Sequence, residues 1–176
     1  MTTGLRRGYV QVYTGNGKGK TTASLGLVIR ALGQGLRPAF LQFMKADPSW
    51  GEIVTLRRLG VRVVQYGAGD WVVEGEATRM DLVAAAAGCA KARELVESGD
   101  FNLVVLDELA TSLYFELVSL DAVLALIAAK PRHVELVITG RHAPSQLIEA
   151  ADLVTEMRPI KHYSDAGVLA RAGIEF

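Results

Sequence analysis

The most informative segment of the sequence is Tyr13-Thr14-Gly15-Asn16-Gly17-Lys18-Gly19-Lys20-Thr21-Thr22. It fits the end of the phosphate-loop pattern G-x-x-x-x-G-K-[ST], whereas Thr14 stands where the pattern has its first glycine. An apolar, β-branched run over 9–13 precedes it, and a helical pattern of apolar residues follows from Lys20. A strand, a glycine-rich turn and a helix in this order predict a loop that binds phosphate groups.

The residue types of this loop define its chemistry. The glycines at 15, 17 and 19 are expected to adopt positive φ angles, so that successive N–H groups form a nest for anionic oxygens. The following helix contributes its N-terminus, Lys20 a positive charge, and Thr21 a hydroxyl for Mg²⁺. The alternative is a glycine-rich turn with two solvated lysines. The predicted nucleotide-binding residues are Gly15, Asn16, Gly17, Lys18, Gly19, Lys20, Thr21 and Thr22.

A second candidate site follows the apolar run 103–106, which leads directly into Asp107 and Glu108. Such a run is typical of a strand buried on both faces, and ligands of open α/β sheets bind at the carboxyl ends of the strands. A carboxylate there holds a metal directly or through water. Because Asp107 and Glu108 point to different sides, only one of them is expected to contact the metal directly. Together with Thr21 they form the predicted metal site; the alternative is an ordinary acidic strand end.

The run Ile138-Thr139-Gly140-Arg141 ends another strand at the same predicted edge. Arg141 would reach a phosphate there, and the alternative is a surface turn. No Asn-Lys-x-Asp motif for guanine is present, so ATP is favoured over GTP. The loop alone leaves ATPases, kinases, GTPases and transferases open, because one fold serves them all.

Apolar runs alternate with helical patterns along the rest of the chain. Strands are expected over 9–13, 38–43, 61–66, 101–106, 134–139 and 153–157. Helices are expected over about 20–32, 52–59, 76–97, 120–129 and 144–151. This alternation predicts an α/β fold with a mainly parallel central sheet and helices on both faces. We expect a single domain over 1–176, with a flexible N-terminus over 1–7.

Composition narrows the classes of function. Half of the 176 residues are hydrophobic, which excludes wholesale disorder, and 19 Lys and Arg balance 19 Asp and Glu, which gives no sign of a nucleic-acid surface. No apolar stretch reaches the roughly 20 residues that span a bilayer, so no membrane partner and a cytoplasmic location are expected. Cys89 has no disulfide partner, and His133, His142 and His162 lie too far apart in sequence for a Cys/His metal cluster.

Several segments together resemble the P-loop-type corrinoid adenosyltransferases, which act on cob(I)alamin or cob(I)yrinic acid a,c-diamide. The resemblance covers nearly the whole chain from Gly8 to Phe176, and the tail is its most specific part. It is carried by the loop 14–22, by Arg30-Ala31-Leu32-Gly33, Gln42-Phe43-Met44-Lys45, Val104-Val105-Leu106-Asp107-Glu108-Leu109 and Ile138-Thr139-Gly140-Arg141, and by the tail segments 158–167 and 172–174.

This resemblance implies a RecA-like P-loop NTPase fold and a homodimer. It implies transfer of the 5′-deoxyadenosyl group of ATP to the cobalt(I) of a reduced corrinoid, with triphosphate as leaving group and Mg²⁺ or Mn²⁺ as metal. The triphosphate would lie in the loop in the reverse of the usual orientation, because the ribose 5′ carbon must face cobalt. An electron donor that reduces cobalt is also implied. The catalytic residues expected are Lys20, Lys18 and Glu108.

The loop over 67–75 departs from the family. Where the family has a Gly-x-Gly-Phe-Thr-Trp-like stretch, this chain has Asp70 at the position of Phe, and Trp71 is displaced by one. We expect Trp71, with Val72 or Val73, to form the apolar wedge beneath the corrin; the alternative is a core plug or an interface anchor. The change leaves the choice of corrinoid open.

Three tail residues, Arg158, Lys161 and His162, are expected to border the nucleotide or the corrinoid side chains, with a structural role as the alternative. Two other functions stay open. One is a P-loop ATPase or small-molecule kinase, which would release ADP. The other is a non-catalytic protein that binds nucleotide and corrinoid without turnover.

Overall fold

The structure is a computed structural model, and it describes residues 4–69, 72 and 75–176. Its centre is a six-stranded sheet in the order β3-β2-β4-β5-β1-β6, and every strand pair in it is parallel. The strands are β1 (Val10–Thr14), β2 (Pro38–Phe43), β3 (Arg62–Tyr66), β4 (Leu103–Asp107), β5 (Glu135–Thr139) and β6 (Leu153–Glu156).

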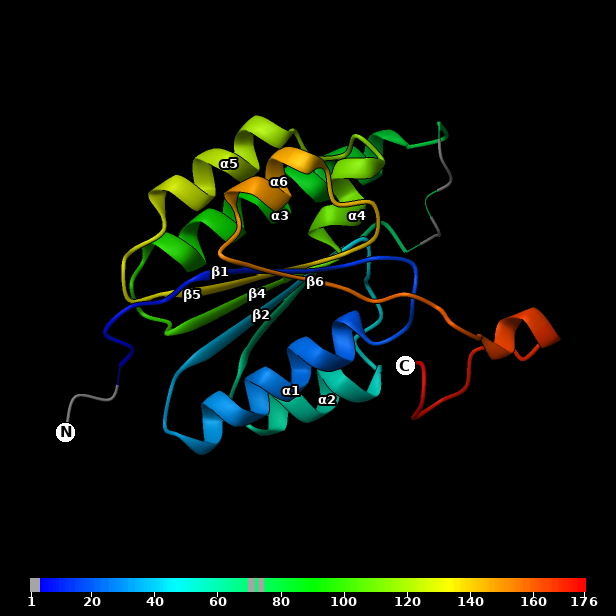
Figure 1. Cartoon of the computed structure of the whole chain (residues 1–176), viewed down its shortest axis with the longest axis horizontal. Coiled ribbons are helices and arrows are strands. Elements are labelled where there is room, and N and C mark those ends of the chain that lie inside the picture. Colours follow the sequence, from blue (N-terminus) through cyan, green and yellow to red (C-terminus); the bar gives the residue numbers. More distant parts are fainter. Residues whose placement is uncertain (1–3, 70–71, 73–74) are drawn as a thin grey trace.

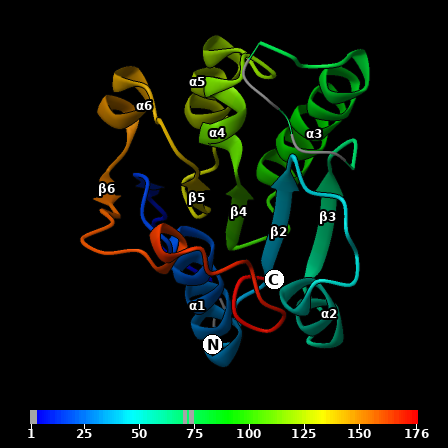
Figure 2. The same cartoon turned by 90° about the vertical axis from the view of Figure 1, so that its right-hand side faces the viewer.

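Helices cover both faces of this sheet (Figures 1 and 2). One face carries α1 (Lys20–Gly33) and α2 (Gly51–Arg58). The other carries α3 (Arg79–Glu97), α4 (Leu109–Tyr114), α5 (Leu120–Ala129) and α6 (Ser145–Ala150). A short 3₁₀ helix, η1 (Tyr163–Ala166), lies in the tail beyond the sheet. The predicted fold class, an α/β domain with a parallel sheet between helices, is confirmed.

The core is divided by the sheet into two clusters, and strand β4 contributes to both. Val104 and Leu106 pack with the cluster under α3 and α5, whereas Leu103 and Val105 pack with the cluster under α1 and α2. All four side chains are buried. Burial on both faces explains why this strand is a continuous apolar run rather than an alternating one.

Two helices differ from the prediction, one in where it begins and one in being present at all. Helix α3 begins at Arg79 because Thr78 caps it: the Thr78 hydroxyl accepts from Asp81 N at 3.2 Å, and Thr78 N donates to the Asp81 carboxylate at 2.9 Å. The prediction had placed this start three residues earlier, at Glu76. Helix α4 is absent from the prediction, because its six residues are too few to show a helical period.

The parallel arrangement brings four chain segments to one edge of the sheet. Strands β1, β2, β4 and β5 end at Thr14, Phe43, Asp107 and Thr139, and the segment after each strand leaves from this edge. In open α/β sheets this is where ligands bind. Within the part of the chain that the structure describes, no helix is both long and apolar enough to cross a bilayer.

The cap of α3 yields a prediction for stability. Replacing Thr78 by Ala removes the hydroxyl that accepts from Asp81 N, and this should lower the free energy of unfolding by about 1 kcal/mol. Thr78→Ser keeps the hydroxyl and serves as the control. Urea unfolding followed by circular dichroism measures both variants, and equal midpoints for Ala and Ser would contradict the role of the cap.

Candidate active site

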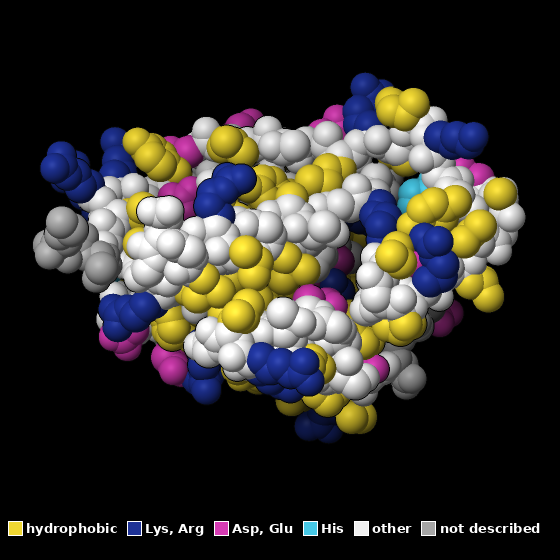
Figure 3. Space-filling model, turned by 90° about the horizontal axis from the view of Figure 1, so that it is seen from below, with side chains coloured by type: hydrophobic (Ala, Val, Ile, Leu, Met, Phe, Trp, Pro, Cys, Tyr) yellow, Lys and Arg dark blue, Asp and Glu magenta, His cyan; other side chains and the backbone are white. Residues whose placement is uncertain are grey.

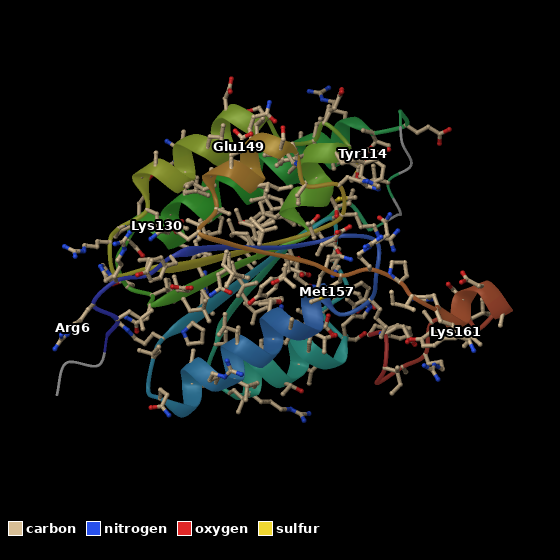
Figure 4. The ribbon with its side chains drawn as sticks, in the orientation of Figure 1. Arg6, Tyr114, Lys130, Glu149, Met157 and Lys161 are labelled. Atoms are coloured by element: carbon tan, nitrogen blue, oxygen red, sulfur yellow. The ribbon has the colours of Figure 1, made fainter. Side chains whose placement is uncertain are left out.

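The loop between β1 and α1 is shaped by its glycines and by the tail. Gly15 and Gly19 have φ angles of 90° and 118°, as predicted. Gly17 does not have a positive φ, so that part of the prediction is wrong. Instead, Gly17 N donates to Met157 O at 2.7 Å, and a Cβ on Gly17 would lie 2.7 Å from the same oxygen. Glycine is required there because the backbone of residue 157 passes against the loop; Met157 lies beside the start of α1 in Figure 4.

Lys20 folds back over this loop. Its Nζ donates to the carbonyl oxygens of Gly15 and Gly17, each at 2.8 Å, and the residue is only 8% exposed. Burial lowers the pKa of Lys20, while the carboxylates of Glu108 and Asp107 act in the opposite direction. An ammonium group has three donors, so one N–H remains for a ligand in the loop.

Asp107 is the most connected side chain at this edge. Its Oδ1 accepts from the hydroxyls of Thr21 at 2.9 Å and Thr139 at 2.7 Å. Its Oδ2 accepts from Gln42 Nε2 at 3.2 Å and Lys45 Nζ at 2.7 Å. The carboxylate is fully buried, which disfavours its charged form, yet Lys45 and the two hydroxyls outweigh burial and hold the pKa of Asp107 below its ordinary value.

Glu108 leaves the strand in a different direction. Its backbone has a left-handed φ of 61° and stands at the start of α4, so the chain leaves the line of the strand at this residue. Thr111 Oγ1 donates to Glu108 Oε2 at 2.5 Å, and Lys45 Nζ lies 3.5 Å from Oε1. The Glu108 side chain is 23% exposed, whereas that of Asp107 is closed to solvent. Of the two, Glu108 is the one that a ligand can reach directly.

Arg141 follows β5 through a tight turn. Gly140 has a φ of 144°, and a Cβ there would lie 2.4 Å from Thr111 N, so glycine is required. Arg141 N donates to Thr111 Oγ1 at 2.9 Å. One hydroxyl, that of Thr111, therefore ties the segment of Arg141 to Glu108.

The carboxyl-terminal tail closes over the loop. Lys18 Nζ donates to Ile174 O at 2.9 Å and lies 3.2 Å from Glu175 Oε1. Glu175 also accepts from Arg171 N at 2.7 Å and from the hydroxyl of Tyr163. The tail is thereby held beside the phosphate loop by the same lysine that was predicted to bind the nucleotide.

Two cavities open at this edge. The first, here called the loop cavity, has a volume of about 560 Å³ and is bordered by the phosphate loop, α2 and the tail. From below, the surface is hollowed between the body of the molecule and the tail (Figure 3). The second, here called the aromatic cavity, has a volume of about 410 Å³ and includes Met44, Val72, Tyr114, Phe115 and His142 in its lining.

The two cavities adjoin, because the same four side chains line both of them: Lys45, Trp50, Glu108 and Arg141. A molecule in the loop cavity and a molecule in the aromatic cavity would meet at these side chains. The arrangement can therefore bring a phosphate-bearing ligand and a large apolar ligand into contact.

Most of the residues predicted from the sequence line the loop cavity. They are Asn16, Gly17, Lys18, Gly19, Lys20, Thr21, Thr22, Glu108, Arg141 and His162. Gly15 and Asp107 lie behind this lining, as partners of Lys20 and Thr21. Arg158 and Lys161 are exposed and do not line either cavity; Lys161 lies out on the tail in Figure 4. Trp71 lies outside the described residues.

Sequence reasoning missed the roles of Lys45, Trp50 and Glu175. From the sequence, Lys45 belongs to a segment of family resemblance and has no role of its own, and Trp50 is expected in the core or at the rim of the site. A signal existed for Lys45, because it follows the carboxyl end of a predicted strand, where ligands of parallel sheets bind. No such signal marked Glu175, whose contact with Lys18 joins opposite ends of the chain.

A divalent metal fits the oxygen groups of the site. Thr21 and Glu108 line the loop cavity and offer hydroxyl and carboxylate oxygens, which Mg²⁺ and Mn²⁺ prefer, whereas Asp107 is closed to solvent behind Thr21. Among the described residues, three or more His, Cys, Asp or Glu side chains nowhere come together as a metal-binding group. The protein therefore provides a partial ligand set of the kind that Mg²⁺ shares with nucleotide phosphates and water.

Comparison with known proteins agrees with this geometry. The sequence matches the family described as ATP:corrinoid adenosyltransferase BtuR/CobO/CobP over residues 6–176. A corrinoid adenosyltransferase of Pseudomonas aeruginosa is 42% identical over 97% of this chain and 84% of its own length. The corrinoid adenosyltransferase CobA of Salmonella typhimurium is 36% identical over 97% of this chain and 86% of its own length. The chain therefore belongs to the ATP:corrinoid adenosyltransferase family, a family of transferase enzymes.

Proposed function

We propose that this chain transfers the 5′-deoxyadenosyl group of ATP to the cobalt(I) of a reduced corrinoid and releases triphosphate. The observation that carries the proposal is the junction of the loop cavity with the aromatic cavity at Lys45, Trp50, Glu108 and Arg141. A phosphoryl transfer to water needs only the first cavity. Transfer of a nucleoside group to a large, partly apolar acceptor needs both, and it needs them side by side.

The loop cavity suits a triphosphate that gains charge as it leaves. The phosphate loop, Lys18 and Lys20 line this cavity, and two of the three donors of Lys20 are used by the loop carbonyls, which leaves one for a phosphate. Such preorganised donors stabilise developing negative charge. Lys18 now contacts Ile174 O and Glu175, so binding of the phosphates would draw it from the tail or share it with the tail.

The metal site completes this stabilisation. Thr21 and Glu108 would hold Mg²⁺ or Mn²⁺. Asp107 would act through Thr21, because it accepts a hydrogen bond from the Thr21 hydroxyl at 2.9 Å. When bound, the metal would neutralise charge on the triphosphate oxygens. Asp107 is closed to solvent and already accepts from four donors, so its role is to orient the Thr21 side chain rather than to face the nucleotide.

The aromatic cavity suits the acceptor. The rings of Tyr114 and His142 stack with their centroids 4.3 Å apart, and Phe115 packs edge-on to Tyr114 at 5.4 Å. Side chains of this kind exclude water, and cobalt(I) itself supplies the nucleophile. Val72, one of the residues expected in the apolar wedge, lines the same cavity. A homodimer and an external electron donor for cobalt belong to the same proposal, and the resemblance to the family supports them.

The function is tested by the products. With ATP, Mg²⁺ and a chemically reduced corrinoid, we expect a light-sensitive cobalt–carbon bond in the absorption spectrum and one triphosphate per adenosylated product. Lys20→Ala should lower the rate roughly 10²-fold or more, because it removes a donor to the leaving group. Lys91→Ala, which alters a surface ion pair on α3, is the control.

Other products would contradict the proposal. Release of ADP would indicate a kinase or an ATPase. Binding of both ATP and corrinoid with no adenosylated product would indicate a protein that binds without turnover. An unchanged rate for Lys20→Ala would show that the loop is not the active site.

The aromatic cavity gives a separate prediction. Tyr114→Leu removes a stacked ring, and the KM for the corrinoid should rise up to about tenfold, as expected for the loss of an aromatic pair. The KM for ATP should stay within about twofold. Tyr9→Leu, just before β1 and outside the lining of both cavities, is the control. Steady-state kinetics measure both KM values. A change in the KM for ATP alone would indicate that Tyr114 contacts the nucleotide instead of the corrinoid.

A further inference from the structure

Lys45 is held at the junction of the two cavities by a tightly fixed backbone. It follows Met44, which has a left-handed φ of 58° and donates its N–H to Tyr66 O at 2.8 Å. Gly67 packs so closely here that a Cβ on it would lie 2.6 Å from Lys45 N. The Lys45 side chain is only 17% exposed. Its position is therefore set by the fold and not by solvent.

The ammonium of Lys45 faces both acidic side chains of the site. Lys45 Nζ lies 2.7 Å from Asp107 Oδ2 and 3.5 Å from Glu108 Oε1. It also lies 5.8 Å from the centre of the Trp50 ring, within the range of a cation–π contact. A single positive charge thus occupies the space between the two carboxylates that were predicted to hold a metal.

This contact also completes the hydrogen bonding of Asp107. A carboxylate has about four lone-pair positions, and Asp107 uses them for Thr21, Thr139, Gln42 and Lys45. A free divalent ion would have to displace an ammonium from a buried carboxylate and would meet repulsion from its charge. It would also have to give up water, which Mg²⁺ does reluctantly.

We propose that the ammonium of Lys45, held between Asp107 and Glu108, keeps a divalent ion away from Glu108 and Thr21 in the nucleotide-free protein, so that the ion enters only together with ATP. The inference rests on the proposed function, because it takes a metal–nucleotide complex as the substrate form. The phosphates supply ligands and negative charge that the protein alone does not offer, and these draw the metal to Thr21 and Glu108. Lys45 is in this account a positioning residue for the metal.

The inference is tested with Mn²⁺ alone, without ATP or corrinoid. The unaltered protein should bind Mn²⁺ weakly, as measured by water proton relaxation. Lys45→Met removes the charge at similar length and should bind Mn²⁺ about tenfold more tightly or better. Lys45→Arg should behave like the unaltered protein, because it keeps a cation. The double variant K45M/E108Q should lose the gain, and Lys91→Met, on α3, should show none.

Two results would overturn the inference. The first is tight Mn²⁺ binding by the unaltered protein without ATP. This measurement does not need the Lys45→Met variant, so it remains valid even if that variant fails to fold. The second is a folded Lys45→Met variant, verified by thermal unfolding, that gains no affinity for Mn²⁺. Neither measurement uses adenosyl transfer, so a failure of the proposed function appears separately, as a lack of adenosylated corrinoid from the unaltered protein.

Discussion

The burial of one carboxylate, that of Asp107, organises the active edge of the sheet. An ionised side chain with no exposure is tolerated only when its partners replace water. Asp107 finds them on three neighbouring elements: Thr21 on α1, Gln42 on β2 and Thr139 on β5, with Lys45 just after β2. The Thr21 hydroxyl, the lysine between the cavities and the end of β5 are fixed relative to one another by this group.

The two cavities follow from that arrangement. Since Asp107 is enclosed, Glu108 is the carboxylate left at the surface, and its left-handed backbone turns it toward the junction of the cavities. Lys45 lies beside both acids there, and Arg141 is tied to the same place through Thr111. Charge is therefore concentrated where phosphates end and an apolar surface begins. In the proposed reaction, that boundary is where the nucleoside group would pass from the triphosphate to its acceptor.

Structural features that depend on neighbouring residues in the sequence are predictable, whereas contacts that depend on the order of the strands in the sheet are not. The loop 13–22 and the buried strand before Asp107 were identified because glycine spacing and an apolar run are local signals. Lys45 meets Asp107 only because β2 lies beside β4, an order that the sequence does not state. Gly17 is a glycine because Met157 passes against it, and not for its φ angle. Helix α4 is too short for its sequence to show a helical period. Glu175 contacts Lys18 from the other end of the chain, and no local pattern predicts such a contact.

We propose that the triphosphate lies in the loop with the ribose 5′ carbon turned toward the aromatic cavity. A crystal structure with Mg²⁺ and ATP bound tests it most directly. The account predicts phosphates against residues 15–21 and the 5′ carbon at the junction lined by Lys45, Trp50, Glu108 and Arg141. An empty loop, or a nucleotide whose terminal phosphate rather than its sugar faces that junction, would contradict it.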